Sequence, residues 1–264
     1  MTRYEGYDAI RFERLGDVLR ATLANPRNEL NAVDGGMHAE LRRLFEELKD
    51  EDAARAVILT GSGRAFSAGG DFDWMAGVRP EDLSGMRREG KQIIWNLLDV
   101  EVPIVAAVNG PAVGLGATLA LLCDVIFMAQ EAKLADPHVR VGIVAGDGGA
   151  VAWPLAVGPA VAKRYLLTGD SMTAADAERL GLINHAVAAG ELQDEALAFA
   201  QRLAQGAPLA VRYTKLAVNQ LVKQAMTTAF DYSTALEVLT FASADHREAL
   251  RALSEKQPAE FSGA

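Results

Sequence analysis

Short apolar runs and stretches with helical spacing alternate along the first part of this sequence. Residues 9–24 hold two short apolar runs on either side of Gly16 and Asp17, a pattern that predicts a β-hairpin. The segment that follows predicts an amphipathic helix, with Asp34 as its N-cap. The apolar positions of this helix recur every three or four residues: Met37, Leu41, Leu44, Phe45 and Leu48.

Three continuous apolar runs predict strands that are buried on both faces: 56–60, 104–108 and 125–128. Segments with helical spacing, 79–98 and 114–122, lie between them. Because strands and helices alternate, we expect an α/β core with parallel strands.

The pattern becomes helical throughout after about residue 190. One apolar stripe contains Leu192, Ala196, Phe199 and Leu203, and later positions continue it: Leu221, Met226, Phe230 and Leu239. We therefore expect an α/β core over residues 1–195 and a helical region over residues 196–264 that packs on the core or on a neighbouring subunit.

Composition narrows the class of protein. The chain has 264 residues, a net charge of -9 and a pI near 5.0, which argues against a nucleic-acid partner because phosphates attract a basic face. Cys123 is the single cysteine, so no intrachain disulfide forms, and a reduced cytoplasmic setting is expected. The start of the chain lacks the apolar core of a signal peptide. The long apolar stretch 103–129 contains Asn109, Pro111 and Asp124, so no membrane span is predicted.

Two glycine-rich turns each follow a predicted buried strand, at residues 61–72 and 109–117. Glycine allows close approach of the backbone to a ligand, so two such turns can direct two amides at one carbonyl oxygen, as in an oxyanion hole. A dinucleotide fingerprint would need a third glycine where the chain has Phe66, and that interpretation fails. The plain alternative is that both turns are only tight connections.

The two turns belong to a longer series of segments that resembles the enoyl-CoA hydratase/isomerase (crotonase) superfamily. The matching segments, in chain order, are 66–71 (FSAGGD), 108–116 (VNGPAVGLG), 122–124 (LCD), 132–137 (AKLADP), 165–169 (YLLTG), 175–184 (ADAERLGLIN) and 255–261 (EKQPAEF). The resemblance covers nearly the whole chain. It implies a spiral of ββα repeats with a helical C-terminal region that forms a homotrimer, or a homohexamer as a dimer of trimers.

The resemblance also implies positions for a substrate site. The two oxyanion-hole amides correspond to Gly70 and Leu115, and Ala68 corresponds to a position whose backbone meets coenzyme A. Lys256 and Phe261 match tail positions that often contact coenzyme A. Coenzyme A would enter as part of an acyl-CoA substrate, and no permanently bound cofactor is expected. Independently of the family, Asp71 and Trp74 follow the first turn and are candidates for the acyl pocket, or else solvated loop residues.

The sequence departs from the family at the catalytic positions. Typical hydratases carry two glutamates where this chain has Thr118 and His138. His138 is followed by Asp147 in a glycine-rich turn, and a histidine held by an aspartate is a competent base near neutral pH. The alternative is a structural histidine and an ordinary turn residue. A similar pair occurs in the β-diketone hydrolase branch of the superfamily, and an aspartate near this turn is the nucleophile in its dehalogenase branch.

The other histidines are interpreted as structural. His38 is predicted on the exposed side of its helix, His185 near a turn, and His246 in a charged helical run. No histidine pair has metal-ligand spacing, and none clusters with Cys123, so no metal site is predicted.

Three functions follow as hypotheses. The first is an acyl-CoA enzyme of the hydratase/isomerase type that stabilises a thioester enolate, with His138 and Asp147 in place of the glutamates. The second is hydrolysis of a carbon–carbon bond in a β-diketone, without coenzyme A. The third is a catalytically inactive scaffold that binds acyl-CoA.

Overall fold

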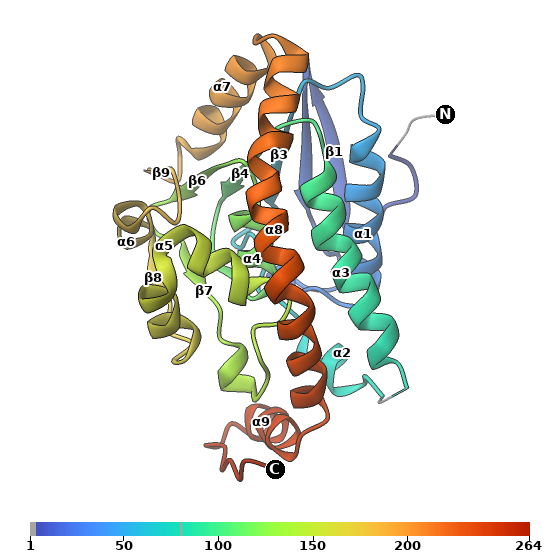
Figure 1. Cartoon of the computed structure of the whole chain (residues 1–264), viewed down its shortest axis with the longest axis vertical. Helices are drawn as coiled ribbons and strands as arrows, with labels where there is room; N and C mark the ends of the chain where they lie inside the picture. Colours follow the sequence, from blue (N-terminus) through green and yellow to red (C-terminus); the bar gives the residue numbers. More distant parts are fainter. Residues whose placement is uncertain (1–3, 80) are drawn as a thin grey trace.

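The computed structural model describes residues 4–79 and 81–264, and within them the strands form two sheets surrounded by helices (Figure 1). The larger sheet has six strands, in the spatial order β1 (Ile10–Leu15), β2 (Val18–Leu23), β3 (Ala56–Gly61), β4 (Ile104–Val108), β6 (Val125–Ala129) and β9 (His185–Val187). Strands β1 and β2 form an antiparallel hairpin, and the remaining neighbours pair in parallel.

The central strands form where the sequence predicts them. All residues of β3 and β4 are buried, which is why both read as unbroken apolar runs. The N-terminal hairpin and β6 are also confirmed.

Helices cover the larger sheet and connect its parallel strands. They are α1 (Gly35–Lys49), α2 (Phe72–Ala76), α3 (Leu83–Asp99), α4 (Leu115–Leu121), α5 (Gly149–Leu166), α6 (Ala174–Leu180), α7 (Leu192–Ala204), α8 (Pro208–Phe241) and α9 (Ala244–Glu255). The Asp34 side chain caps α1 by accepting a hydrogen bond from the Met37 amide at 2.9 Å, as predicted. Helix α3 begins later than predicted because Asp82 donates its amide to the Arg79 carbonyl in a turn before the helix.

The smaller sheet supports the connection between the second glycine-rich turn and the residues that follow β6. It contains β5 (Ala112–Val113), β7 (Lys133–Ala135) and β8 (Met172–Thr173). A short 3-10 helix, η1 (His138–Val141), leaves the end of β7. The order of elements thus carries His138 to the edge of the second turn.

The helical C-terminal region is confirmed. Helix α7 packs on strands of the larger sheet, and α8 runs along most of the molecule, with α9 and the C-terminus at its lower end (Figure 1). The expected boundary between residues 195 and 196 falls inside α7, and the division itself stays a prediction.

Helix α8 also exposes large apolar side chains: Leu209, Tyr213, Val218, Leu221, Tyr232 and Leu239. Such a surface fits a subunit contact, so the homotrimer or homohexamer remains a prediction.

None of the described helices combines the length and the hydropathy that a membrane span requires.

Candidate active site

The two glycine-rich turns lie against each other. Ser67 of the first turn bridges Ala112 of the second, and the Val113 amide donates a hydrogen bond to the Ser67 carbonyl at 2.9 Å. A Cβ atom on Gly69 would lie 2.7 Å from the Val113 carbonyl oxygen, and one on Gly116 would lie 2.7 Å from the Ser67 carbonyl oxygen. Glycine is therefore required where the two backbones meet.

This contact leaves two amides without partners. The Val33 amide donates a hydrogen bond to the Gly69 carbonyl, and the Val33 carbonyl accepts one from the Asp71 amide. The amide of Gly70 takes part in neither of these hydrogen bonds. Leu115 is the first residue of α4, where the helix offers no acceptor. Within residues 4–79 and 81–264 neither amide donates a hydrogen bond, and both residues line the same cavity. These are the features of an oxyanion hole.

The cavity has a volume of about 140 Å³ and brings together most of the predicted site. The predicted residues that line it are Ala68, Gly70, Trp74, Leu115, His138 and Asp147. Its apolar wall includes Met75, Met86, Ile143, Phe230, Val238 and Phe241. An apolar pocket with a few convergent polar groups is the usual form of a small-molecule site.

The other predicted residues lie outside the cavity lining. Asp71 caps α2 by accepting a hydrogen bond from the Trp74 amide at 3.0 Å, and its assignment to the acyl pocket stays a prediction. Lys256 and Phe261 are exposed in the tail that follows α9, and this single chain does not bring them to the cavity. Their contact with coenzyme A stays a prediction.

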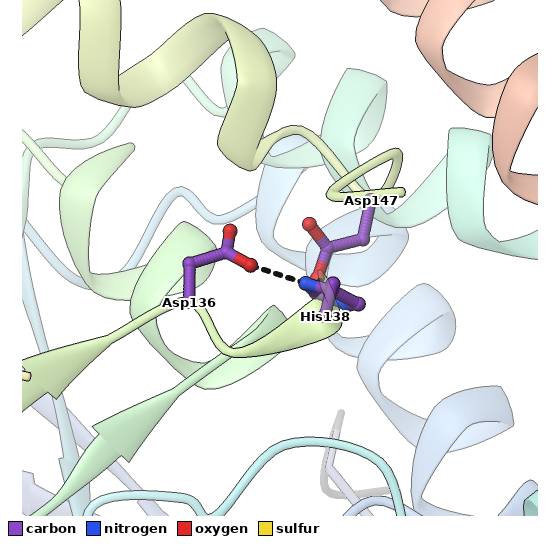
Figure 2. A group of neighbouring side chains, drawn as sticks. All are labelled: Asp136, His138 and Asp147. Atoms are coloured by element: carbon purple, nitrogen blue, oxygen red, sulfur yellow. Dashed lines mark hydrogen bonds and ion pairs between the residues drawn. The ribbon is translucent and has the colours of Figure 1, made fainter. Parts of the chain in front are cut away.

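His138 lies at the edge of the second turn, with its ring beside Gly114. Gly114 has φ 52°, and a Cβ atom there would lie 3.3 Å from Cε1 of the ring. The ring Nδ1 faces Oδ1 of Asp136, a fully buried residue, in a short hydrogen bond (Figure 2). The residue that orients the ring is therefore Asp136, where the sequence suggested Asp147.

Asp147 also approaches the ring, from the turn that precedes α5 (Figure 2). Its Oδ1 accepts hydrogen bonds from the Thr118 hydroxyl and from the Gly149 amide, both at 3.2 Å. Its Oδ2 is buried, has no hydrogen-bond partner among the described residues, and lies 3.6 Å from Nε2 of His138. Thr118, which replaces a glutamate of the family, thus positions the carboxylate of Asp147.

The carboxylates decide the charge of the imidazole. Burial lowers the pKa of His138, but the negative charges of Asp136 and Asp147 outweigh this effect and raise the pKa to about 10. Burial raises the pKa of Asp147, and the positive charge of His138 opposes that rise. The ring is therefore an imidazolium at neutral pH, and the pKa of Asp147 remains above its ordinary value because burial outweighs the charge of His138.

Sequence reasoning missed two acidic residues of this site. Asp136 lies two positions before His138, and that spacing was an available signal. Glu237 comes from α8 and lines the cavity beside the turn of Asp147, with its side chain against Gly146. Burial is the main cause that raises the pKa of Glu237 to about 8. No local pattern in the sequence announces Glu237, because only the packing of α8 brings it here.

One of the remaining histidines differs from its predicted surroundings. His38 is buried, with 5% of its surface exposed, and its Nδ1 binds Glu89 at 2.7 Å, so its predicted exposure was wrong. His246 is also buried, and its Nδ1 binds the Val141 carbonyl at 2.6 Å. His185 is exposed on β9.

Asp136, His138 and Asp147 also form a group whose possible ligand atoms all lie within 4.8 Å of one another. The ring Nδ1 faces Asp136, and the nearest ring atom to the Asp147 carboxylate is Nε2. A single ion could engage only one of these nitrogens, so the arrangement fits charge pairing better than chelation. The expectation of no metal stays a prediction.

The charge of His138 can be measured by titration. In an NMR titration the His138 ring should stay protonated through neutral pH and titrate near pH 10. Asp136→Asn removes a negative charge and should lower this pKa substantially. His246 is an internal reference, because burial lowers its pKa. A wild-type His138 that titrates at the ordinary histidine value would contradict the assignment.

Comparisons with known proteins agree with the geometry. The family model described as enoyl-CoA hydratase/isomerase matches residues 13–264. A probable enoyl-CoA hydratase of Mycobacterium tuberculosis is 35% identical over 255 residues, which is 97% of this chain and 98% of that protein.

Two solved structures are also similar. An enoyl-CoA hydratase/isomerase from Mycobacterium paratuberculosis has a TM-score of 0.89 and 38% identity, covering 94% of this chain and 99% of that chain. A β-diketone hydrolase from the cyanobacterium Anabaena has a TM-score of 0.85 and 32% identity, covering 91% and 97%. The α/β core is therefore of the crotonase fold, and the chain, with its paired glycine-rich turns and helical C-terminus, belongs to the enoyl-CoA hydratase/isomerase family of enzymes.

Proposed function

We propose that this enzyme forms and protonates the enolate of an acyl-CoA thioester. One observation carries the proposal: two unpaired amides, of Gly70 and Leu115, open into the cavity that also contains the buried pair of His138 and Asp147. Coenzyme A enters as part of the substrate, and no other cofactor is required for this step.

The amides and the acidic pair have different tasks. The thioester oxygen accepts hydrogen bonds from Gly70 and Leu115, which stabilise the negative charge that develops there. Asp147 accepts the proton from the α-carbon, so the C–H bond breaks and its electron pair moves toward the thioester oxygen. His138 already carries its proton and stabilises the ionised form of Asp147, which makes the aspartate the base and the histidine the charged partner.

A second reaction uses the same groups. The similar solved structure of a β-diketone hydrolase supports cleavage of a carbon–carbon bond in a cyclic diketone, where the hole would hold the product enolate. In that reaction water attacks a carbonyl carbon, and the His138–Asp147 pair accepts the proton from water. The two reactions differ in whether the ligand carries coenzyme A.

Proton exchange tests the proposal independently of the final product. The enzyme should catalyse exchange of the α-protons of butanoyl-CoA in D₂O, followed as loss of the α-proton signal by NMR. Asp147→Asn should abolish the exchange, because the amide is not a base. The exposed His185→Ala variant serves as the control and should exchange at the wild-type rate.

Two outcomes would point elsewhere. Thermal stabilisation by a cyclic 1,3-diketone, with none by CoA thioesters, would favour the hydrolase reaction. If the protein binds butanoyl-CoA but catalyses neither α-proton exchange nor turnover of a CoA thioester or a cyclic 1,3-diketone, the inactive scaffold would be the remaining hypothesis.

A further inference from the structure

Beyond the oxyanion hole, the cavity continues between α3 and α8. Met86, Arg87, Gly90 and Lys91 share one face of α3 at helical spacing and line the cavity. Opposite them α8 contributes apolar side chains, including Phe230, Val238 and Phe241. A group attached to the acyl carbon would extend between these two helices.

Arg87 is a cation in this largely apolar lining, and its charge is not balanced by the protein. Its Nε is enclosed and has no hydrogen-bond partner, and no ion pair to Arg87 occurs in the described part of the chain. The neighbouring Lys91 differs because it pairs with Asp231 of α8. An arginine cannot lose its proton in a protein, so a partly buried guanidinium with no paired anion favours the binding of one.

The carboxyl groups of the cavity do not neutralise Arg87. Asp147 faces His138. Burial raises the pKa of Glu237 to about 8, so this side chain is mostly uncharged at neutral pH. Glu89, two residues after Arg87 on α3, pairs with His38 and Arg42. A positive charge therefore remains available to a ligand.

We propose that Arg87 binds a carboxylate at the far end of the acyl group, so that the preferred substrates are CoA thioesters of dicarboxylic acids. This inference rests on the proposed function, because the acyl group is placed by the oxyanion hole. Guanidinium and carboxylate match in shape and form two parallel hydrogen bonds. Because Nε is enclosed, Arg87 suits a small ligand group that enters the cavity. The phosphates of coenzyme A are bulky and strongly hydrated, so they suit it less.

Binding of matched saturated thioesters tests this inference without turnover. Calorimetry would compare succinyl-, glutaryl- and adipyl-CoA with butanoyl-, pentanoyl- and hexanoyl-CoA, which have the same chain lengths but no carboxylate. In at least one pair the dicarboxylic thioester should bind about 10- to 100-fold more tightly. Arg87→Met should reduce that ratio to about one. Arg88→Met is the matched control, because Arg88 is exposed and does not line the cavity, and it should retain the ratio.

Three results would overturn the assignment. One is a wild-type protein without preference at any chain length, or without measurable binding of any of the six thioesters. A second is a preference that survives in Arg87→Met. The third is an Arg87→Met variant that weakens both members of a pair equally, which would place a phosphate of coenzyme A at Arg87.

The α-proton exchange experiment separates this inference from the proposed function. A carboxylate preference without exchange would remove the enolate chemistry and retain the role of Arg87. Exchange without the carboxylate preference would retain the enolate chemistry and remove the role of Arg87.

Discussion

Turnover is expected to fall by about 10²- to 10³-fold when Leu115 is replaced by proline. Leu115 is the first residue of α4, a position where proline fits a helix because its amide is not used within the helix. Gly114 precedes it and lacks the Cβ atom that would clash with the proline ring. The substitution therefore removes a hydrogen bond to the substrate oxygen while the helix remains.

Leu115→Ala is the matched control for this prediction. It keeps the amide and shortens a buried side chain, so stability should decrease while kcat changes little. Gly70→Pro removes the other amide and should cause a loss similar to that of Leu115→Pro. Steady-state kinetics and thermal unfolding of each variant separate the two effects. A folded Leu115→Pro variant with wild-type kcat would show that this amide does not contact the substrate.

His138→Ala and Asp147→Asn should each lower kcat by about 10²- to 10⁴-fold. The first removes the positive charge that favours the ionised form of Asp147, and the second removes the base itself. Because the two side chains act as one unit, the double variant should lose little more than the worse single variant. The measurement is kcat for each of the three variants, with the thioester Kd measured separately to show that binding survives.

His246→Asn provides a comparison for the dyad. His246 is buried and does not itself line the cavity, although it binds the carbonyl of the lining residue Val141, so its replacement should affect stability more than kcat. Losses that add fully in the double variant would mean that His138 and Asp147 act independently.

Features carried by continuous segments were predictable from the sequence. The buried runs of β3 and β4 need no information beyond their apolar residues, because both faces of each strand are covered. The glycine-rich turns could be placed for the same reason, since each directly follows one of these strands. Their mutual contact, through Ser67 and Val113, was only suggested by the pairing of neighbouring strands.

Features that depend on packing between distant elements were not predictable in the same way. His38 looked exposed because its helix is amphipathic, but α3 covers that side and supplies Glu89 as its partner. Asp147 looked like the residue that orients His138, although the shorter path through Pro137 brings Asp136 to the same ring. Glu237 lies on a helix whose pattern gives no sign of which turn meets the cavity.

The proposed oxyanion hole is made of main chain, whereas the proposed acid–base groups are side chains on different elements. Its amides are held by the contact between the turns after β3 and β4, and the backbone hydrogen bonds of that contact use none of the side chains of residues 118, 136, 138, 147 or 237. Substitutions at these five positions can therefore alter proton transfer while the site still binds a carbonyl oxygen. Such a separation makes the scaffold evolvable: a new reaction requires a few changes of side chain and no new way to stabilise an enolate.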